Sequence, residues 1–229
     1  MPKMSAEYLE QKRDSFLNAA YKVCMNKPMY EVSMRDIISA AGGSQGNIYR
    51  YFSNLDEVLI ALINRESVYC DIKALTDAAI SSNQTPEKII SDILSVWEKA
   101  VLVNLVGIGK IYYEISVIYV SDKERLNRFT SSIHFSSTEG YLWEKLYQFI
   151  VERISEGYFK PKLPIDDIVK FHVTSIDGIT RDLILCNHYQ MPLPIPGTLE
   201  KEKLVKNFCT VFLMLLGGNE KIIFEENLL

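Results

Sequence analysis

Apolar residues recur every three or four positions along most of the chain, which is the spacing of amphipathic α-helices. The first such segment predicts a helix from Glu7 to Asn26, ended by Pro28. The same spacing predicts helices over residues 54–80, 86–101, 110–120, 122–158, 165–188 and 199–216, the fourth of these with an interruption near Gly140. The alternating pattern of a β-strand does not occur, so an all-α fold of about nine helices is expected.

Residues 33–52 predict two short helices joined by a tight turn. Ser33 followed by Asp36 is the spacing of a capping box at a helix start. Gly42-Gly43 ends this helix, because glycine adopts the left-handed conformation without steric cost. Ser44 is placed to cap the second helix, in which Ile48 and Phe52 lie one turn apart and face inward.

The second helix presents polar side chains on its outer face: Gln45, Asn47, Tyr49, Arg50 and Tyr51. Amides and guanidinium groups pair with base edges, whereas hydroxyls and backbone N–H groups reach phosphates. The face therefore suits a DNA groove. Periodicity by itself equally allows an ordinary polar surface helix.

The order of residues favours the DNA-binding interpretation. Ile-x-x-Ala-Ala-Gly-x-Ser-x-Gly-x-Ile-Tyr-x-Tyr-Phe, followed by Ser53-Asn54-Leu55-Asp56-Glu57, resembles the helix-turn-helix of TetR-family transcriptional regulators over about residues 12–66. The resemblance implies a DNA-binding set of Ser33, Arg35, Ser44, Gln45, Gly46, Asn47, Tyr49, Arg50 and Tyr51. Two positions depart from the family: Gly43 replaces a small aliphatic residue, and Leu55 replaces a lysine that contacts a phosphate.

The motif and the helices after it predict two domains. Residues 1–53 form a helix-turn-helix DNA-binding domain, and residues 54–229 form a helical effector-binding and dimerisation domain. A motif of this size reads only a half-site, so a homodimer on a palindromic operator is expected. The resemblance places the dimer interface on the last two helices, with candidates Gly178, Leu204, Phe208, Phe212 and Leu215.

Aromatic residues concentrate in the second domain, where they suit a pocket for a small, mainly apolar effector, although aromatic residues at helical spacing more often belong to a core. The effector-binding candidates are Trp97, Tyr112, Tyr113, Glu114, Phe129, Phe135, Trp143, Tyr147, His172 and Asp177, with His134 as a further polar group. Asp177 and Arg181 are spaced for an ion pair.

Composition restricts the function further. The net charge is −4, but residues 1–66 carry eight basic and eight acidic groups and are neutral. Within residues 12–50, six basic groups stand against three acidic ones. This modest local excess of positive charge suits a protein that reads a short groove better than one that coats nucleic acid non-specifically. The four cysteines are scattered, which is typical of reduced thiols in a cytosolic protein, and no Cys/His cluster indicates a metal or cofactor. Signatures of a nucleophile elbow, phosphate loop or paired carboxylates are missing, so an enzyme is not expected.

Residues 101–120 are mostly apolar and long enough to cross a membrane. Lys110 and Glu114 at the centre, together with Gly107 and Gly109, favour a buried helix pair with a turn. The favoured function is thus a cytoplasmic, dimeric repressor released from its operator by an effector. Two alternatives stay open: activation instead of repression, and a helical ligand-binding protein whose degenerate head no longer reads DNA.

Overall fold

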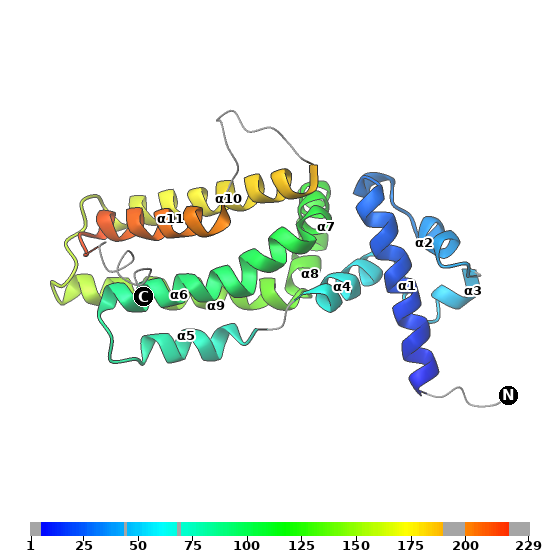
Figure 1. Cartoon of the computed structure of the whole chain (residues 1–229), viewed down its shortest axis with the longest axis horizontal. Coiled ribbons are helices and arrows are strands. Elements are labelled where there is room, and N and C mark those ends of the chain that lie inside the picture. Colours follow the sequence, from blue (N-terminus) through cyan, green and yellow to red (C-terminus); the bar gives the residue numbers. More distant parts are fainter. Residues whose placement is uncertain (1–5, 44, 68–69, 190–199, 220–229) are drawn as a thin grey trace. The chain divides into compact units, whose positions relative to one another are not determined.

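The structure is a computed structural model that describes residues 6–43, 45–67, 70–189 and 200–219. All regular structure in these ranges is helical, which confirms the all-α prediction (Figure 1). The side chains of Gln45 and Phe135, all of Ser44 and the proline-rich stretch 191–197 lie outside what is described.

The chain divides into two compact units. The first comprises Met1–Ser67 and Ile108–His134, and the second comprises Val68–Gly107 and Phe135–Leu229. The chain passes from one unit to the other three times, and all three boundaries fall within the stretch 54–229 that was expected to be one domain, so none coincides with residue 53. The functional division at residue 53 stays a prediction.

The first unit contains α1 (Ala6–Asn26), a 3₁₀ turn (Met29–Glu31), α2 (Met34–Ala40), α3 (Gln45–Ile48), α4 (Leu55–Glu66), most of α7 (Val103–Tyr119) and α8 (Lys123–Ser131). Its first four helices bury Leu17, Ile37, Ile48 and Leu59 completely. Helix α1 packs against both α2 and α4. The helix-turn-helix is therefore held by a shared apolar core.

Two charged residues of α7 fasten the carboxyl end of α1. The Lys110 Nζ donates hydrogen bonds to the carbonyl oxygens of Cys24 at 2.7 Å and Lys27 at 2.8 Å. It also pairs with Glu114 at 3.2 Å, and Glu114 accepts from the Met29 backbone N–H at 2.6 Å. The last carbonyls of a helix lack partners within it, and here a buried ammonium supplies them. Lys110 and Glu114 thus have a structural role in the most apolar stretch of the sequence.

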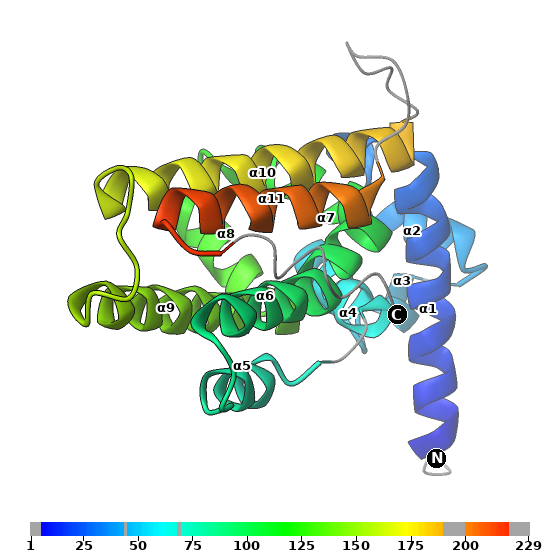
Figure 2. The same cartoon turned by 60° about the vertical axis from the view of Figure 1, so that its left-hand side comes forward.

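The second unit contains α5 (Ile72–Ile80), α6 (Pro86–Trp97), a π-helical turn (Glu98–Leu102), the first residues of α7, α9 (His134–Ser155), α10 (Ile165–Tyr189) and α11 (Lys201–Leu216). Helices α10 and α11 run side by side in both views (Figures 1 and 2). Helix α5 packs on α6, and buried residues of α6, α9, α10 and α11 form the core.

Three predicted helices are wrong in their limits. The helix expected over 54–80 is two helices, because Ser67 takes an extended backbone after α4 and Asp71 caps α5. The turn expected at Gly107 and Gly109 is absent, since α6, the π turn and α7 follow one another without a break from Pro86 to Tyr119. The segment 122–158 breaks at Ser132, whereas α9 continues through Gly140.

The stretch Pro86–Tyr119 is long and apolar enough to cross a membrane, and half of its most apolar window is buried inside the structure. Such a stretch is equally typical of a core helix. The buried contacts of Lys110 give its charge a partner within the protein.

Candidate nucleic-acid interface and effector site

The turn between α2 and α3 has the geometry that its sequence predicts. Ser33 caps α2 in a complete capping box: its hydroxyl accepts from the Asp36 N–H, and the Asp36 carboxylate accepts from the Ser33 N–H at 2.9 Å. These bonds, with the hydroxyl of Ser33 and the ammonium of Lys27, lower the pKa of Asp36 to about 2. Gly42 follows with φ of 61°, a backbone conformation that favours glycine.

The glycine that departs from the family has a specific packing partner. A Cβ at Gly43 would lie 3.3 Å from Cε1 of Phe16, which is 3% exposed. The ring of Phe16 also lies 5.7 Å from the ring of Tyr51, centroid to centroid. Phe16 on α1 therefore takes up the space that an aliphatic side chain would occupy at residue 43, so the departure leaves no hole between the helices.

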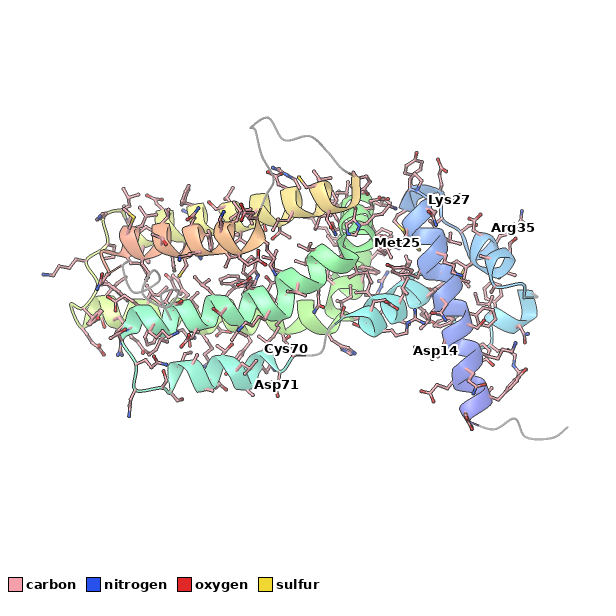
Figure 3. The ribbon with its side chains drawn as sticks, in the orientation of Figure 1. Asp14, Met25, Lys27, Arg35, Cys70 and Asp71 are labelled. Atoms are coloured by element: carbon pink, nitrogen blue, oxygen red, sulfur yellow. The ribbon has the colours of Figure 1, made fainter. Side chains whose placement is uncertain are left out.

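The second helix of the motif is shorter than expected. Helix α3 ends at Ile48, and a turn follows in which the N–H groups of Tyr51 and Phe52 donate to the Ile48 carbonyl. Asn47, Tyr49 and Arg50 are exposed along this segment, Tyr49 to 47%. Arg35 is exposed on α2 (Figure 3).

The other five candidates for DNA contact differ from these in exposure or lie outside the described side chains. Tyr51 is half-buried against Phe16, so its ring serves the packing of the motif. The hydroxyl of Ser33 is engaged in the capping box. Gly46 is exposed, while Ser44 and the side chain of Gln45 lie outside the described residues.

A polar cluster that sequence reasoning missed holds the start of α4. Asp56 accepts from the Tyr119 hydroxyl at 2.5 Å and from the Arg125 guanidinium at 2.7 and 2.9 Å. Arg125 also lies 3.9 Å from the centre of the Tyr119 ring. Hydrogen bonding from Arg125 lowers the pKa of Asp56. The cluster orients the helix that begins at Leu55, the residue that departs from the family's lysine.

The effector-binding candidates are divided between the two units. Tyr112, Tyr113, Glu114 and Phe129 belong to the first unit, whereas Trp97, Trp143, Tyr147, His172 and Asp177 belong to the second. Glu114 is engaged with Lys110 and Met29, and Phe129 is buried edge-on against Tyr119. The assignment of these residues to an effector site stays a prediction, and the contacts described next are those of the second group.

Within the second unit, both tryptophans of the chain converge on one carboxylate. The indole N–H groups of Trp97 and Trp143 donate to the same oxygen of Glu139, at 3.2 and 3.1 Å. The two indole rings lie 6.0 Å apart between centroids. Burial raises the pKa of Glu139, and the nearby Asp177 raises it further. Glu139 had no sequence signal, because the three residues come from different turns of α6 and α9.

His172 lies next to this cluster, with its ring stacked 3.9 Å from Phe208 and 3.7 Å from Phe212. The rings of His172 and Trp143 pack edge to face, with 6.2 Å between their centroids. Its Nε2 is buried without a hydrogen-bond partner among the described residues, and burial lowers its pKa to about 3. His172 is therefore neutral at physiological pH. The ion pair expected between Asp177 and Arg181 does not form, because Arg181 pairs with Asp182 at 3.0 Å.

Two dimer-interface candidates are corrected by the packing of α11. Phe208 and Phe212 are 8% and 3% exposed and stack on His172, so they belong to the core of the subunit. The opposite stripe of α11 exposes Val211 and Met214, and α10 exposes Phe171. Leu204 and Leu215 are half-buried, and nothing lies within 4 Å of a Cβ placed on Gly178.

Comparisons with known proteins agree with this architecture. Residues 16–62 match the family profile described as bacterial regulatory proteins, tetR family. An uncharacterised HTH-type transcriptional regulator of Bacillus subtilis, YfiR, is 25% identical over 211 residues, covering 89% of this chain and 94% of that protein.

Two solved structures share the fold at 18% identity. The fatty acid degradation regulator FadR of Bacillus halodurans superimposes with a TM-score of 0.53, covering 92% of this chain and 96% of its own. FadR of Bacillus subtilis, in complex with stearoyl-CoA, gives a TM-score of 0.50 and covers 90% and 98%. The resemblance indicated by the helix-turn-helix sequence is confirmed.

Proposed function

We propose that this chain, which belongs to the TetR family of bacterial transcriptional regulators, is a cytoplasmic, dimeric repressor that leaves a palindromic operator when a small, mainly apolar effector binds. The observation that carries the proposal is the capped, glycine-turned helix-turn-helix with Asn47, Tyr49 and Arg50 exposed on its second segment. In this account Gln45, Asn47 and Arg50 read base edges, and Tyr49 contacts a phosphate.

These roles predict different mutant behaviour. Arg50→Ala removes a donor to a base edge and should relax the preference at one position of each half-site, at a cost of about 1–3 kcal/mol. Tyr49→Phe removes only a hydroxyl and should weaken binding to all sequences equally. Both effects can be measured by fluorescence anisotropy, as the affinity of each variant for an operator and for its single-base variants. A changed base preference in Tyr49→Phe, or an unchanged one in Arg50→Ala, would contradict the assignment.

The position of Leu55 offers a gain-of-function test. Leu55 is half-buried at the first residue of α4, where the N-terminal end of a helix favours an anion. Leu55→Lys should therefore add a phosphate contact in each half-site, tighten DNA binding and steepen the dependence of log K on log salt by about 0.9 for each half-site. A variant that binds DNA no better and with the same salt slope would show that α4 does not approach the backbone.

Features of the second unit support two further parts of the proposal, effector binding and dimerisation. Trp97, Trp143 and His172 form an aromatic cluster with polar groups that have few partners, which suits a mainly apolar effector with one polar feature. Effector binding there would favour a conformation of the dimer in which the spacing of the two DNA-binding domains no longer fits successive major grooves. The expected coupling is about 1–3 kcal/mol, or roughly 5–150-fold in operator affinity.

Dimerisation would use the exposed stripe of α10 and α11. Phe171, Val211 and Met214 are 55%, 43% and 42% exposed, and exposed apolar residues on adjoining helices are typical of an interface. Because nothing lies within 4 Å of a Cβ placed on Gly178, the backbone of a partner helix has room to approach α10 there. Sedimentation at micromolar concentration tests the state, and a monomer would contradict it.

A further inference from the structure

Helix α4, which follows the helix-turn-helix, is fastened at its first turn to a distant part of the chain. The Asp56 carboxylate accepts from the Tyr119 hydroxyl at 2.5 Å and from two nitrogens of the Arg125 guanidinium at 2.7 and 2.9 Å. Arg125 also donates to the Tyr119 oxygen at 2.8 Å, so the three side chains form one network. A two-bonded pair between a guanidinium and a carboxylate fixes direction as well as distance. The start of α4 is thus held by the end of α7 and by α8.

The last turns of α4 are fastened by a second, independent pair of bonds. The half-buried Asn64 side chain donates from Nδ2 to the Ser132 carbonyl at 2.9 Å, and its Oδ1 accepts from the His134 backbone N–H at 2.9 Å. These two backbone groups lie just after α8 and at the first residue of α9, where helices leave carbonyls and N–H groups without internal partners. The amide uses its donor and its acceptor in the roles that each has. Asn64 therefore ties α4 to the end of α8.

All these bonds lead to one continuous stretch, residues 108–134, which we call the α7–α8 segment. The same segment holds the carboxyl end of α1 through Lys110 and Glu114. Every fastening lies within the first compact unit. Hydrogen bonds and ion pairs fix direction, whereas apolar packing is non-directional. A helix held at two points about 12 Å apart along its axis does not turn on its support.

We propose that Asp56, Asn64 and Arg125 are positioning residues for operator binding: they hold the helix-turn-helix rigidly on the α7–α8 segment, which sets the direction in which the motif meets DNA. This inference rests on the proposed function, since a fixed direction matters when the two motifs of a dimer must meet two half-sites together. The three residues act without touching DNA. A displacement of the α7–α8 segment redirects the motif without any movement of α4 within the unit.

This role has a signature that a direct DNA contact does not share. A dimer gains affinity on a palindrome because its second motif binds intramolecularly, at an effective concentration that depends on how well geometry fits. Loosening the motif lowers that effective concentration. A single half-site is met by one motif, which adjusts its direction freely. Loss of a positioning residue should therefore weaken binding to the palindrome and spare binding to a single half-site.

The test compares two duplexes of equal length: a palindrome selected from a random pool by the full-length protein, and a duplex that keeps one half-site and scrambles the other. Arg125→Met removes the bonds to Asp56, so affinity for the palindrome should fall at least about fivefold and affinity for the half-site duplex should change less than about twofold. Arg128→Met removes the same charge from a residue of α8 that is 70% exposed, and should change neither. Unchanged palindrome affinity in Arg125→Met, or an equal loss on both duplexes, would overturn the proposal.

The second fastening is tested by a change that keeps the shape of the side chain. Asn64→Asp turns a carboxylate oxygen toward the Ser132 carbonyl in place of the amide donor, and should give the same selective loss on the palindrome. Asn127→Asp adds the same charge at an exposed residue of α8 and is the control. Arg125→Lys keeps the charge and one bond, so its loss should be smaller than that of Arg125→Met. Circular dichroism checks the fold. If Arg125→Met does not fold, unmodified palindrome affinity in both Asn64→Asp and Arg125→Lys overturns the proposal.

The unmodified protein separates this proposal from the proposed function. A palindrome bound no more tightly than the half-site duplex contradicts the dimeric repressor, and the positioning role with it. A palindrome bound more tightly, with a gain that survives in Arg125→Met and Asn64→Asp, supports the repressor and contradicts the positioning role alone.

Discussion

The fastening of α1 by Lys110 and Glu114 gives the most quantitative prediction. Their side chains are 9% and 17% exposed and lie 3.2 Å apart, so solvent screens the pair only weakly. Breaking a buried pair by removing one partner costs about 3–5 kcal/mol when the remaining charge has no other bond. Here Lys110 keeps two carbonyl acceptors and the residue at 114 keeps the Met29 N–H. We therefore expect Glu114→Gln to lower the free energy of unfolding by about 2–3 kcal/mol.

Lys110→Met removes the same pair from the other side and leaves the carbonyls of Cys24 and Lys27 without that donor. It should cost a similar amount, and the double variant should cost about 1–2 kcal/mol less than the sum of the two, because each single change already breaks the pair. Each single loss is smaller than the total stability of about 5–15 kcal/mol typical of a domain, so the variants should remain folded.

Urea unfolding at 25 °C followed by circular dichroism measures these differences. A matched control is the exposed Glu124–Arg128 pair on α8, which has the same i, i+4 spacing but is 91% and 70% exposed. Glu124→Gln should cost less than about 0.5 kcal/mol. A loss in Glu114→Gln no larger than this control, or strict additivity in the double variant, would refute the reasoning.

Three further predictions concern titration and assembly. Burial lowers the pKa of His172 to about 3, so between pH 6.5 and 3 the unfolded state binds a proton that the folded state does not. The free energy of unfolding should therefore fall by up to about 1.4 kcal/mol per pH unit in this range. Urea unfolding at several pH values should show a shallower fall in His172→Gln than in the exposed control His134→Gln. Asp36 has a pKa lowered to about 2, so its stabilisation is present above about pH 4 and is lost as pH falls through 2; acid titration of Asp36→Asn should lack this component, and an identical profile would contradict it. Val211→Asp should yield a folded monomer in sedimentation, whereas Phe212→Asp should unfold the subunit, and the reverse result would exchange their assigned faces.

Local signals in the sequence predicted the local structure well. The Ser33–Asp36 capping box and the left-handed Gly42 depend on residues within one turn of each other, so their spacing is sufficient. The helix from residue 7 to 26 also follows its pattern, because Pro28 prevents continuation. These features required no knowledge of tertiary packing.

Tertiary packing explains what the sequence left unresolved. Helix α11 is apolar on two faces, and periodicity cannot decide which one meets its own subunit; His172 stacks on Phe208 and Phe212 and settles it. The role of Gly43 becomes visible only beside Phe16, which is far away in sequence. The bond of Glu139 to Trp97 and those of Lys110 to the Cys24 and Lys27 carbonyls also join residues that are far apart in sequence, so no local motif could predict them.

The central claim is that this chain reads DNA as a two-fold dimer. Selection of bound duplexes from a random pool by the purified full-length protein, followed by sequencing, tests that claim most directly. We expect enrichment of a palindrome whose half-sites are centred about one helical turn, or a multiple of it, apart, with affinity that falls as salt rises. A pool without any enriched sequence, or binding that does not depend on sequence, would contradict the account.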